Sequence, residues 1–120
     1  MRRRRPSPLL SESASLPLVP PERLRASPEA YQPVDVRSRA GYLSGRVPGA
    51  LHVPWDLIGE HLEPMRARPG RTLVLYCEHG GRARRAADHL RSMGIGPLAL
   101  LNGHMARWRG LGLPFERDGA

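Results

Sequence analysis

The sequence predicts one α/β domain with a mostly parallel central sheet and helices on both faces. Short apolar runs typical of buried strands alternate with segments whose apolar residues recur at helical spacing. The strongest strand candidate, residues 72–76, is apolar almost throughout, as expected of a central parallel strand covered on both faces. The 120 residues suffice for one hydrophobic core. We expect the domain over residues 16–118, after a disordered Arg-, Ser- and Pro-rich leader over residues 1–15.

Periodicity and turn residues place the individual elements. Apolar residues at helical spacing predict one helix from Trp55 to Met65. A second apolar stripe runs from Ala83 to Met93, and Gly94 is well placed to cap the end of that helix. The other expected elements are strands at 16–19, 34–36, 50–53, 72–76 and 98–101, short helices at 20–24 and 105–108, and turns at Pro48-Gly49 and Pro69-Gly70.

The composition argues against several classes of function. All 19 basic residues are arginines and the formal net charge is +8, but aromatic residues make up only 5% of the chain. Without aromatic stacking platforms or a reading motif, we expect no nucleic-acid partner. No apolar run is long enough to span a bilayer, and the arginines at positions 2–5 are not followed by the apolar core of a signal peptide. We therefore expect a cytoplasmic protein with no membrane partner.

The single cysteine, Cys77, carries the strongest functional signal. It cannot close an intramolecular disulfide, and it lies between the best strand and a helix, where ligands bind in open α/β sheets. Gly80 and Gly81 allow backbone N–H groups to point inward, the helix adds its positive end, and Arg82 adds a full charge. These features stabilise a thiolate or a persulfide anion and attract anionic donors. The alternative is an inert cysteine at the end of a core strand.

Four motifs resemble the rhodanese family of sulfurtransferases, in the order and at the spacing usual there. The segment Cys77-x-x-Gly80-x-Arg82 resembles the active-site loop, and Asp35-Val36-Arg37 resembles the early D-V-R motif. Residues 45–54 resemble the G-H-I-P-G-A segment with its following strand and proline. Residues 101–108 resemble the closing L-x-G-G-x-x-x-W. The resemblance covers about residues 16 to 117 and implies a three-layer rhodanese-like fold.

The resemblance also implies a mechanism. The Cys77 thiolate would attack the sulfane sulfur of a small anionic donor such as thiosulfate and become a persulfide. A thiol, a protein or another thiophilic acceptor would then remove the outer sulfur. That family uses no metal or organic cofactor, and we expect a monomer or a weak dimer. Besides Cys77, the implied site residues are Arg37 and the loop residues Glu78, His79, Gly80, Gly81 and Arg82. The backbone amides of the loop residues would cradle the persulfide, and Arg82 would also brace the loop.

Three positions depart from the family pattern. Arg46 replaces the usual histidine, which we expect to be neutral. His104 stands where a second glycine is common, which bears on the turn at Gly103. Ala83 replaces a serine or threonine, and the missing hydroxyl bears on the choice of donor.

Two loop residues are not diagnostic of the family. Glu78 places a negative charge beside the nucleophile, which should oppose the thiolate and discourage anionic donors. His79 would offset that charge or shuttle a proton, although a solvated loop histidine is the simpler interpretation.

Other functions remain as alternatives. A cysteine phosphatase or arsenate reductase on a related fold would have five residues between its cysteine and its arginine. In this sequence only four residues separate Cys77 from Arg82, so the loop is one residue shorter. The shorter loop closes a smaller ring of amides, which suits one sulfur better than a tetrahedral oxyanion. A non-catalytic or relay module that binds a partner protein is the other alternative, although inactive members usually lack the cysteine. Cys77 and His79 form only a C-x-H pair, so no metal site is expected.

Overall fold

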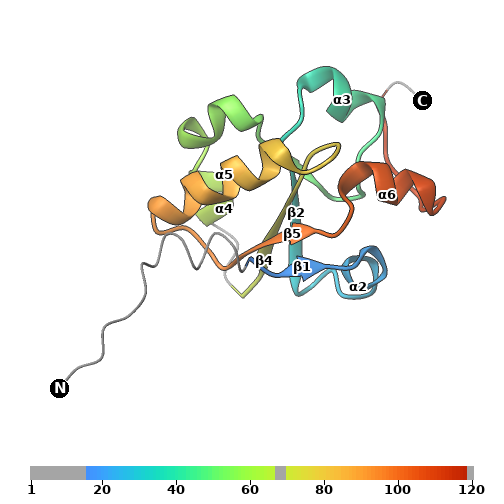
Figure 1. The fold of residues 1–120 in the computed structure, drawn as a ribbon, viewed down its shortest axis with the longest axis horizontal. Coiled ribbons are helices and arrows are strands. Elements are labelled where there is room, and N and C mark those ends of the chain that lie inside the picture. The colour runs from blue at the N-terminus through green and yellow to red at the C-terminus, as the bar shows by residue number, and fades with distance from the viewer. Residues whose placement is uncertain (1–15, 67–69, 119–120) are drawn as a thin grey trace.

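Five strands form the central sheet in the order β1-β5-β4-β2-β3, and every neighbouring pair is parallel (Figure 1). The computed structural model describes residues 16–66 and 70–118. The expected leader at 1–15 and the turn residue Pro69 therefore lie outside the described residues. The strands are β1 (Leu18–Val19), β2 (Tyr31–Asp35), β3 (Leu51–His52), β4 (Thr72–Tyr76) and β5 (Leu98–Leu101).

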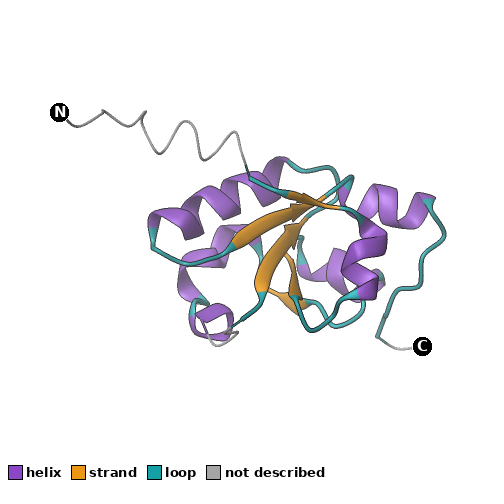
Figure 2. Ribbon diagram, turned by 90° about the horizontal axis from the view of Figure 1, so that it is seen from below, coloured by secondary structure: helices purple, strands orange, loops and turns teal. Residues whose placement is uncertain are grey.

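Helices cover both faces of the sheet (Figure 2). Along β4, Leu73 and Leu75 pack into one apolar cluster, and Val74 and Tyr76 pack into a second cluster on the opposite face. This alternation follows from the two-residue period of a strand. The expected three-layer α/β fold is confirmed. The helices are α2 (Pro21–Ala26), α3 (Arg39–Ser44), the 3-10 helix η1 (Trp55–Glu60), α4 (Glu63–Arg66), α5 (Gly81–Ser92) and α6 (His104–Gly110).

Strand β2 begins three residues before the expected strand at 34–36 and ends one residue before its end, so it includes Pro33. The N–H of Val36 donates to the carbonyl of Tyr76 in β4 at 3.0 Å. Because N–H directions alternate along a strand, Pro33 faces the other neighbour, β3, whose pairing reaches back only to Val34. The missing N–H of Pro33 therefore breaks no hydrogen bond of the sheet. The two edge strands, β1 and β3, have two residues each and are therefore shorter than the strands expected at 16–19 and 50–53.

The expected helix from Trp55 to Met65 is instead two short helices, η1 and α4, so that prediction is wrong. Proline cannot donate a backbone hydrogen bond and is accepted only in the first turn of a helix. Pro64 occupies the second position of α4, so the chain has to begin a new helix there. Ile58 and Met65 still bury their side chains, which is why the apolar pattern imitated one continuous helix.

Helix α3 has no counterpart among the expected elements. Its start is marked only by Ser38, whose hydroxyl accepts a hydrogen bond from the N–H of Gly41 at 3.3 Å. None of its residues is buried. A helix without a buried face leaves no apolar period in the sequence, so periodicity did not find it.

Helix α5 confirms the prediction from the apolar stripe between residues 83 and 93. Ala83, Ala87 and Leu90 are fully buried, whereas Met93 is exposed and ends the stripe one turn early. Met93 is the capping residue itself, and Gly94 follows it. With 12 residues, α5 is the longest helix in the described part of the chain, and none there is long and apolar enough to cross a membrane.

The register of the sheet brings three chain segments to one edge. Tyr76 of β4 pairs with Asp35 of β2, and Leu75 pairs with Leu100 of β5. The residues that follow these strands therefore meet at the carboxyl edge of the sheet. They are Cys77 after β4, residues 36–37 after β2, and the turn at 102–103 after β5.

Candidate active site

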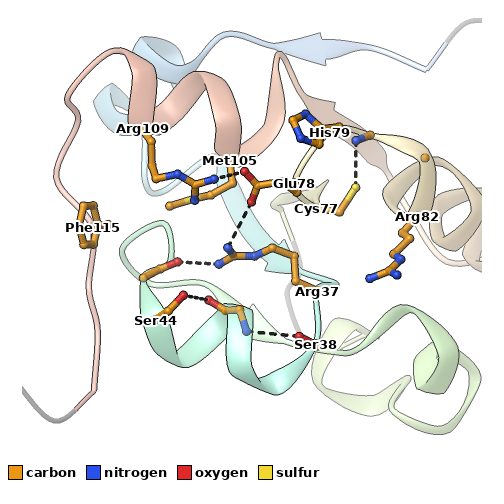
Figure 3. Close-up of a pocket in the computed structure, with 14 residues that line it drawn as sticks. Arg37, Ser38, Ser44, Cys77, Glu78, His79, Arg82, Met105, Arg109 and Phe115 are labelled. Carbon is orange, nitrogen blue, oxygen red and sulfur yellow. Dashed lines mark hydrogen bonds and ion pairs between the residues drawn. The ribbon is translucent and has the colours of Figure 1, made fainter.

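Cys77 lies at the carboxyl end of β4, and its sulfur faces the loop that leads into α5 (Figure 3). The Sγ atom accepts hydrogen bonds from the backbone N–H of Gly80 at 3.0 Å and from that of Ala83 at 3.4 Å. The residue is only 4% exposed, yet it lines the cavity at this edge of the sheet. Two amide donors and the first turn of α5 thus surround one sulfur atom, an arrangement that favours negative charge on it.

The amino end of α6 fixes the other side of this loop. The N–H of Met105 donates to the carbonyl of Cys77 at 3.0 Å, and the N–H of Ala106 donates to the carbonyl of Glu78 at 3.2 Å. These donors are among the first N–H groups of a helix, which have no partner inside it. Gly80, with φ +123°, then turns the chain so that its own N–H points back at the sulfur.

His104 is buried directly against the loop, with 7% of its surface exposed. Its Nδ1 accepts a hydrogen bond from the N–H of Cys77 at 3.3 Å, so the ring proton lies on Nε2. His104 has φ +55°, a conformation in which glycine is common, and the turn at Gly103 is therefore kept despite the change of residue. Burial, followed by the charges of Arg84 and His79, lowers the pKa of His104 to about 4.

Arg37 is held rigidly beneath the cavity. Its Nε and Nη2 donate to both oxygens of Asp35 at 2.7 to 3.2 Å, and Nη2 also donates to the carbonyl of Gly45 at 2.6 Å. Burial opposes its charge, but the hydrogen bonds and charge of Asp35 outweigh that effect and raise the pKa of Arg37. The Tyr76 hydroxyl donates to the same carboxylate at 2.9 Å. The D-V-R motif thus anchors a guanidinium that lines the cavity.

Glu78 bridges two arginines across the cavity (Figure 3). One carboxylate oxygen pairs with Nη2 of Arg109 on α6, and the other lies 3.7 Å from Nη1 of Arg37. The negative charge that we expected to oppose the thiolate is therefore paired with two positive charges. Sequence reasoning missed Arg109, because it lies 31 positions further along the chain.

Arg82 and His79 are both exposed at the cavity. Arg82 lies in the first turn of α5, with its guanidinium carbon 5.6 Å from the centre of the Trp55 ring. Among the residues that the structure describes, Arg82 has no carboxylate partner. Its positive charge therefore remains available at the cavity. The loop itself is braced by α6 and His104. Within residues 16–66 and 70–118, no hydrogen bond from the Arg82 side chain braces it.

The cavity has a volume of about 800 Å³. It brings together all the residues predicted for the site. Sequence reasoning missed the lining contributed by α3 and its two flanking residues, by α6 and by the segment after α6. Gly45 and Met105 lie within two of the four motifs, but a motif match does not show which of its residues face the cavity. The other missed residues belong to no motif and to no apolar period. The missed lining residues are Ser38, Gly41, Ser44, Gly45, Met105, Arg109 and Phe115. Over residues 16–66 and 70–118, no three His, Cys, Asp or Glu side chains are grouped as a metal ion would require.

Known proteins are similar to this chain in sequence and in fold. Residues 21–111 match the family model of the rhodanese-like domain. A sulfurtransferase of Allochromatium vinosum is 34% identical over 81 residues, which cover 68% of this chain and 74% of that protein. The thiosulfate sulfurtransferase GlpE of Pseudomonas fluorescens is 30% identical over 92 residues, which cover 76% and 83%.

A solved structure extends the likeness to three dimensions. The rhodanese-related protein of Thermoplasma volcanium superposes with a TM-score of 0.74 at 20% identity, over 85% of this chain and 99% of that one. At this identity the superposition establishes the fold. The family match covers most of the chain, and the four motifs lie together at the carboxyl edge of the sheet or support it. The chain therefore belongs to the rhodanese-like domain family.

Proposed function

We propose that the protein is a sulfurtransferase that carries a sulfane sulfur as a persulfide on Cys77. A small anionic donor such as thiosulfate supplies the sulfur, and a thiophilic acceptor, either a small thiol or a protein, removes it. The observation that carries the proposal is the Cys77 sulfur, which accepts two backbone hydrogen bonds at the start of α5. Family membership and the relatives named as sulfurtransferases support the same reaction class.

The first half-reaction is a displacement at sulfur. The Cys77 thiolate attacks the outer sulfur of thiosulfate, a new S–S bond forms, and the bond to the sulfonyl sulfur breaks. The electron pair of the broken bond leaves with sulfite. The total charge is conserved, because a thiolate and a thiosulfate dianion become a persulfide anion and a sulfite dianion. No metal or organic cofactor enters this step.

The loop would stabilise the persulfide through its backbone. The N–H groups of Gly80 and Ala83 already donate to the Cys77 sulfur, and the same donors would reach a persulfide there. Arg82 contributes a positive charge at the cavity, as the D-V-R arginine, Arg37, does from below. Ala83 takes part through its N–H, so the absent hydroxyl removes none of these donors.

We propose that the enzyme acts in the cytoplasm as a monomer or a weak dimer, without nucleic-acid or membrane partners. The residues before Leu16 form a leader that the reaction does not need.

Mass spectrometry after incubation with thiosulfate tests the proposal. The intact protein should gain about 32 Da, the mass of one sulfur, and dithiothreitol should remove it through thiol exchange. Cys77→Ser should gain nothing. A protein that hydrolyses para-nitrophenyl phosphate through Cys77 and never gains the sulfur mass would be a phosphatase instead.

A further inference from the structure

The carboxylate of Glu78 lies in the cavity one residue after the nucleophile (Figure 3). Its side chain is 38% exposed, and that of its partner Arg109 is 45% exposed. Both groups are thus within reach of a bound molecule. A pair of opposite charges near the reacting sulfur is therefore part of the surface that a bound substrate contacts.

The Glu78–Arg109 pair has little structural purpose. The backbone carbonyls of Cys77 and Glu78 already tie the loop to α6, so the carboxylate is not needed for that link. Arg37 is already satisfied by Asp35 and by the Gly45 carbonyl. Ion pairs at this degree of exposure add little to stability. The side chains of Glu78 and Arg109 are therefore free to serve recognition.

The same pair is poorly suited to select an inorganic dianion. The Glu78 carboxylate pairs with Nη1 of Arg37 and with Nη2 of Arg109. These are the donors that thiosulfate would otherwise use. A second anion brought beside this carboxylate also meets like-charge repulsion. A molecule with both an ammonium and a carboxylate group avoids this conflict, because each of its charges has an opposite partner here.

The cavity is also larger than an inorganic donor requires. Its volume of about 800 Å³ falls within the range of sites that enclose organic ligands of drug size. Its lining includes the aromatic ring of Phe115, which is 40% exposed. There is room and apolar surface for an organic group attached to the attacking sulfur.

We propose that Glu78 and Arg109 determine specificity for the sulfur acceptor, and that this acceptor is an amino-acid or peptide thiol with a free ammonium and a free carboxylate group. The inference rests on the proposed sulfurtransferase function. The ammonium group of the acceptor pairs with Glu78, its carboxylate pairs with Arg109, and its body packs against Phe115.

The transfer step balances without any further reactant. The acceptor thiolate attacks the outer sulfur of the Cys77 persulfide, and a new S–S bond joins the acceptor sulfur to the transferred atom. The bond between that atom and Sγ breaks, and its electron pair restores the Cys77 thiolate. The acceptor leaves as a persulfide, and no external oxidant or reductant is used.

Matched acceptors test the ammonium group. Full-length protein is loaded with sulfur from thiosulfate and mixed with cysteinylglycine or with N-acetylcysteinylglycine, and the loss of the sulfur mass is followed in time. The wild type should prefer the free amine, and Glu78→Gln should reduce that preference by roughly tenfold, the effect of one lost charge-assisted hydrogen bond. Comparing the preference between variants cancels the different intrinsic reactivities of the two thiols.

Control variants keep the test specific. Glu63→Gln on α4 removes an equally charged side chain that is 86% exposed and outside the cavity, and it should leave the preference unchanged. Arg109→Gln should instead reduce the preference for cysteinylglycine over cysteinylglycinamide, which lacks the free carboxylate. Thermal melting of each variant confirms that it is folded.

Each outcome is decisive. If the wild type loads sulfur but its preference for the free amine is absent, or is unchanged in Glu78→Gln, the acceptor assignment is overturned while the sulfurtransferase function stands. If no variant with an intact Cys77 ever gains the sulfur mass, the proposed function itself fails.

Discussion

The backbone N–H of Cys77 donates to Nδ1 of His104, 3.3 Å away, so a neutral imidazole supports the residue that carries the nucleophile. The two residues are 27 positions apart and lie on neighbouring segments at the carboxyl edge of the sheet. A protonated ring would present an N–H to the N–H of Cys77, and the hydrogen bond would be lost.

His104 should make the stability of the fold depend on pH. Its pKa is lowered to about 4 from 6.5, so the unfolded chain binds the proton more readily than the native protein. The stabilisation is complete above about pH 6.5 and is lost as the pH falls toward 4, by on the order of 3 kcal/mol. Urea unfolding between pH 4 and pH 7 measures this slope. His104→Asn, which tolerates a positive φ but does not titrate, should flatten it. An equal slope in both proteins would assign the effect to other groups.

Cys77→Ser should abolish sulfur transfer and leave the fold nearly unchanged. The serine oxygen is smaller than sulfur, so it fits the same space, and it can accept hydrogen bonds from Gly80 and Ala83. The free energy of unfolding should change by less than about 1 kcal/mol, while thiocyanate formation from thiosulfate and cyanide disappears. A loss of several kcal/mol would point to a structural core cysteine.

The two loop glycines should respond differently to substitution. A Cβ at Gly80 would lie 2.9 Å from Nε2 of His104, and the backbone there has φ +123°. A Cβ at Gly81 would meet nothing within 4 Å. Gly80→Ala should cost about 1–3 kcal/mol of stability and most of the activity, whereas Gly81→Ala should change stability by less than about 0.5 kcal/mol. Chemical denaturation and the thiosulfate assay report both effects. Equal sensitivity of both positions would contradict this account of the loop.

Glu78→Gln should improve thiosulfate as a donor. Removing the carboxylate frees Nη1 of Arg37 and the guanidinium of Arg109 for the dianion. We expect kcat/KM for thiosulfate to rise by roughly three- to tenfold at low salt, and the gain to shrink at high ionic strength because the charges are screened. Glu63→Gln provides the control. An unchanged or lower kcat/KM would mean that Glu78 does not hinder anionic donors.

Local patterns in the sequence predicted the helices and strands that bury one or both faces in the core. The apolar run at 72–76 is β4, and the stripe that begins at Ala83 is α5, because a strand or helix with a buried face leaves its period in the chain. The same reasoning failed for α3, which buries no residue. It also failed for the segment from Trp55 to Met65, where a new helix begins with Pro64 in its first turn.

The sequence by itself determined the fold class, the family resemblance and the position of Cys77 between a central strand and a helix. Only the tertiary structure decided what surrounds the sulfur: His104 behind the loop, Arg109 paired with Glu78, and Phe115 at the cavity. The physical reason is that the register of parallel strands, and not proximity in the chain, brings the ends of β2, β4 and β5 together. Contacts between side chains from those separate ends leave no periodic trace in the sequence.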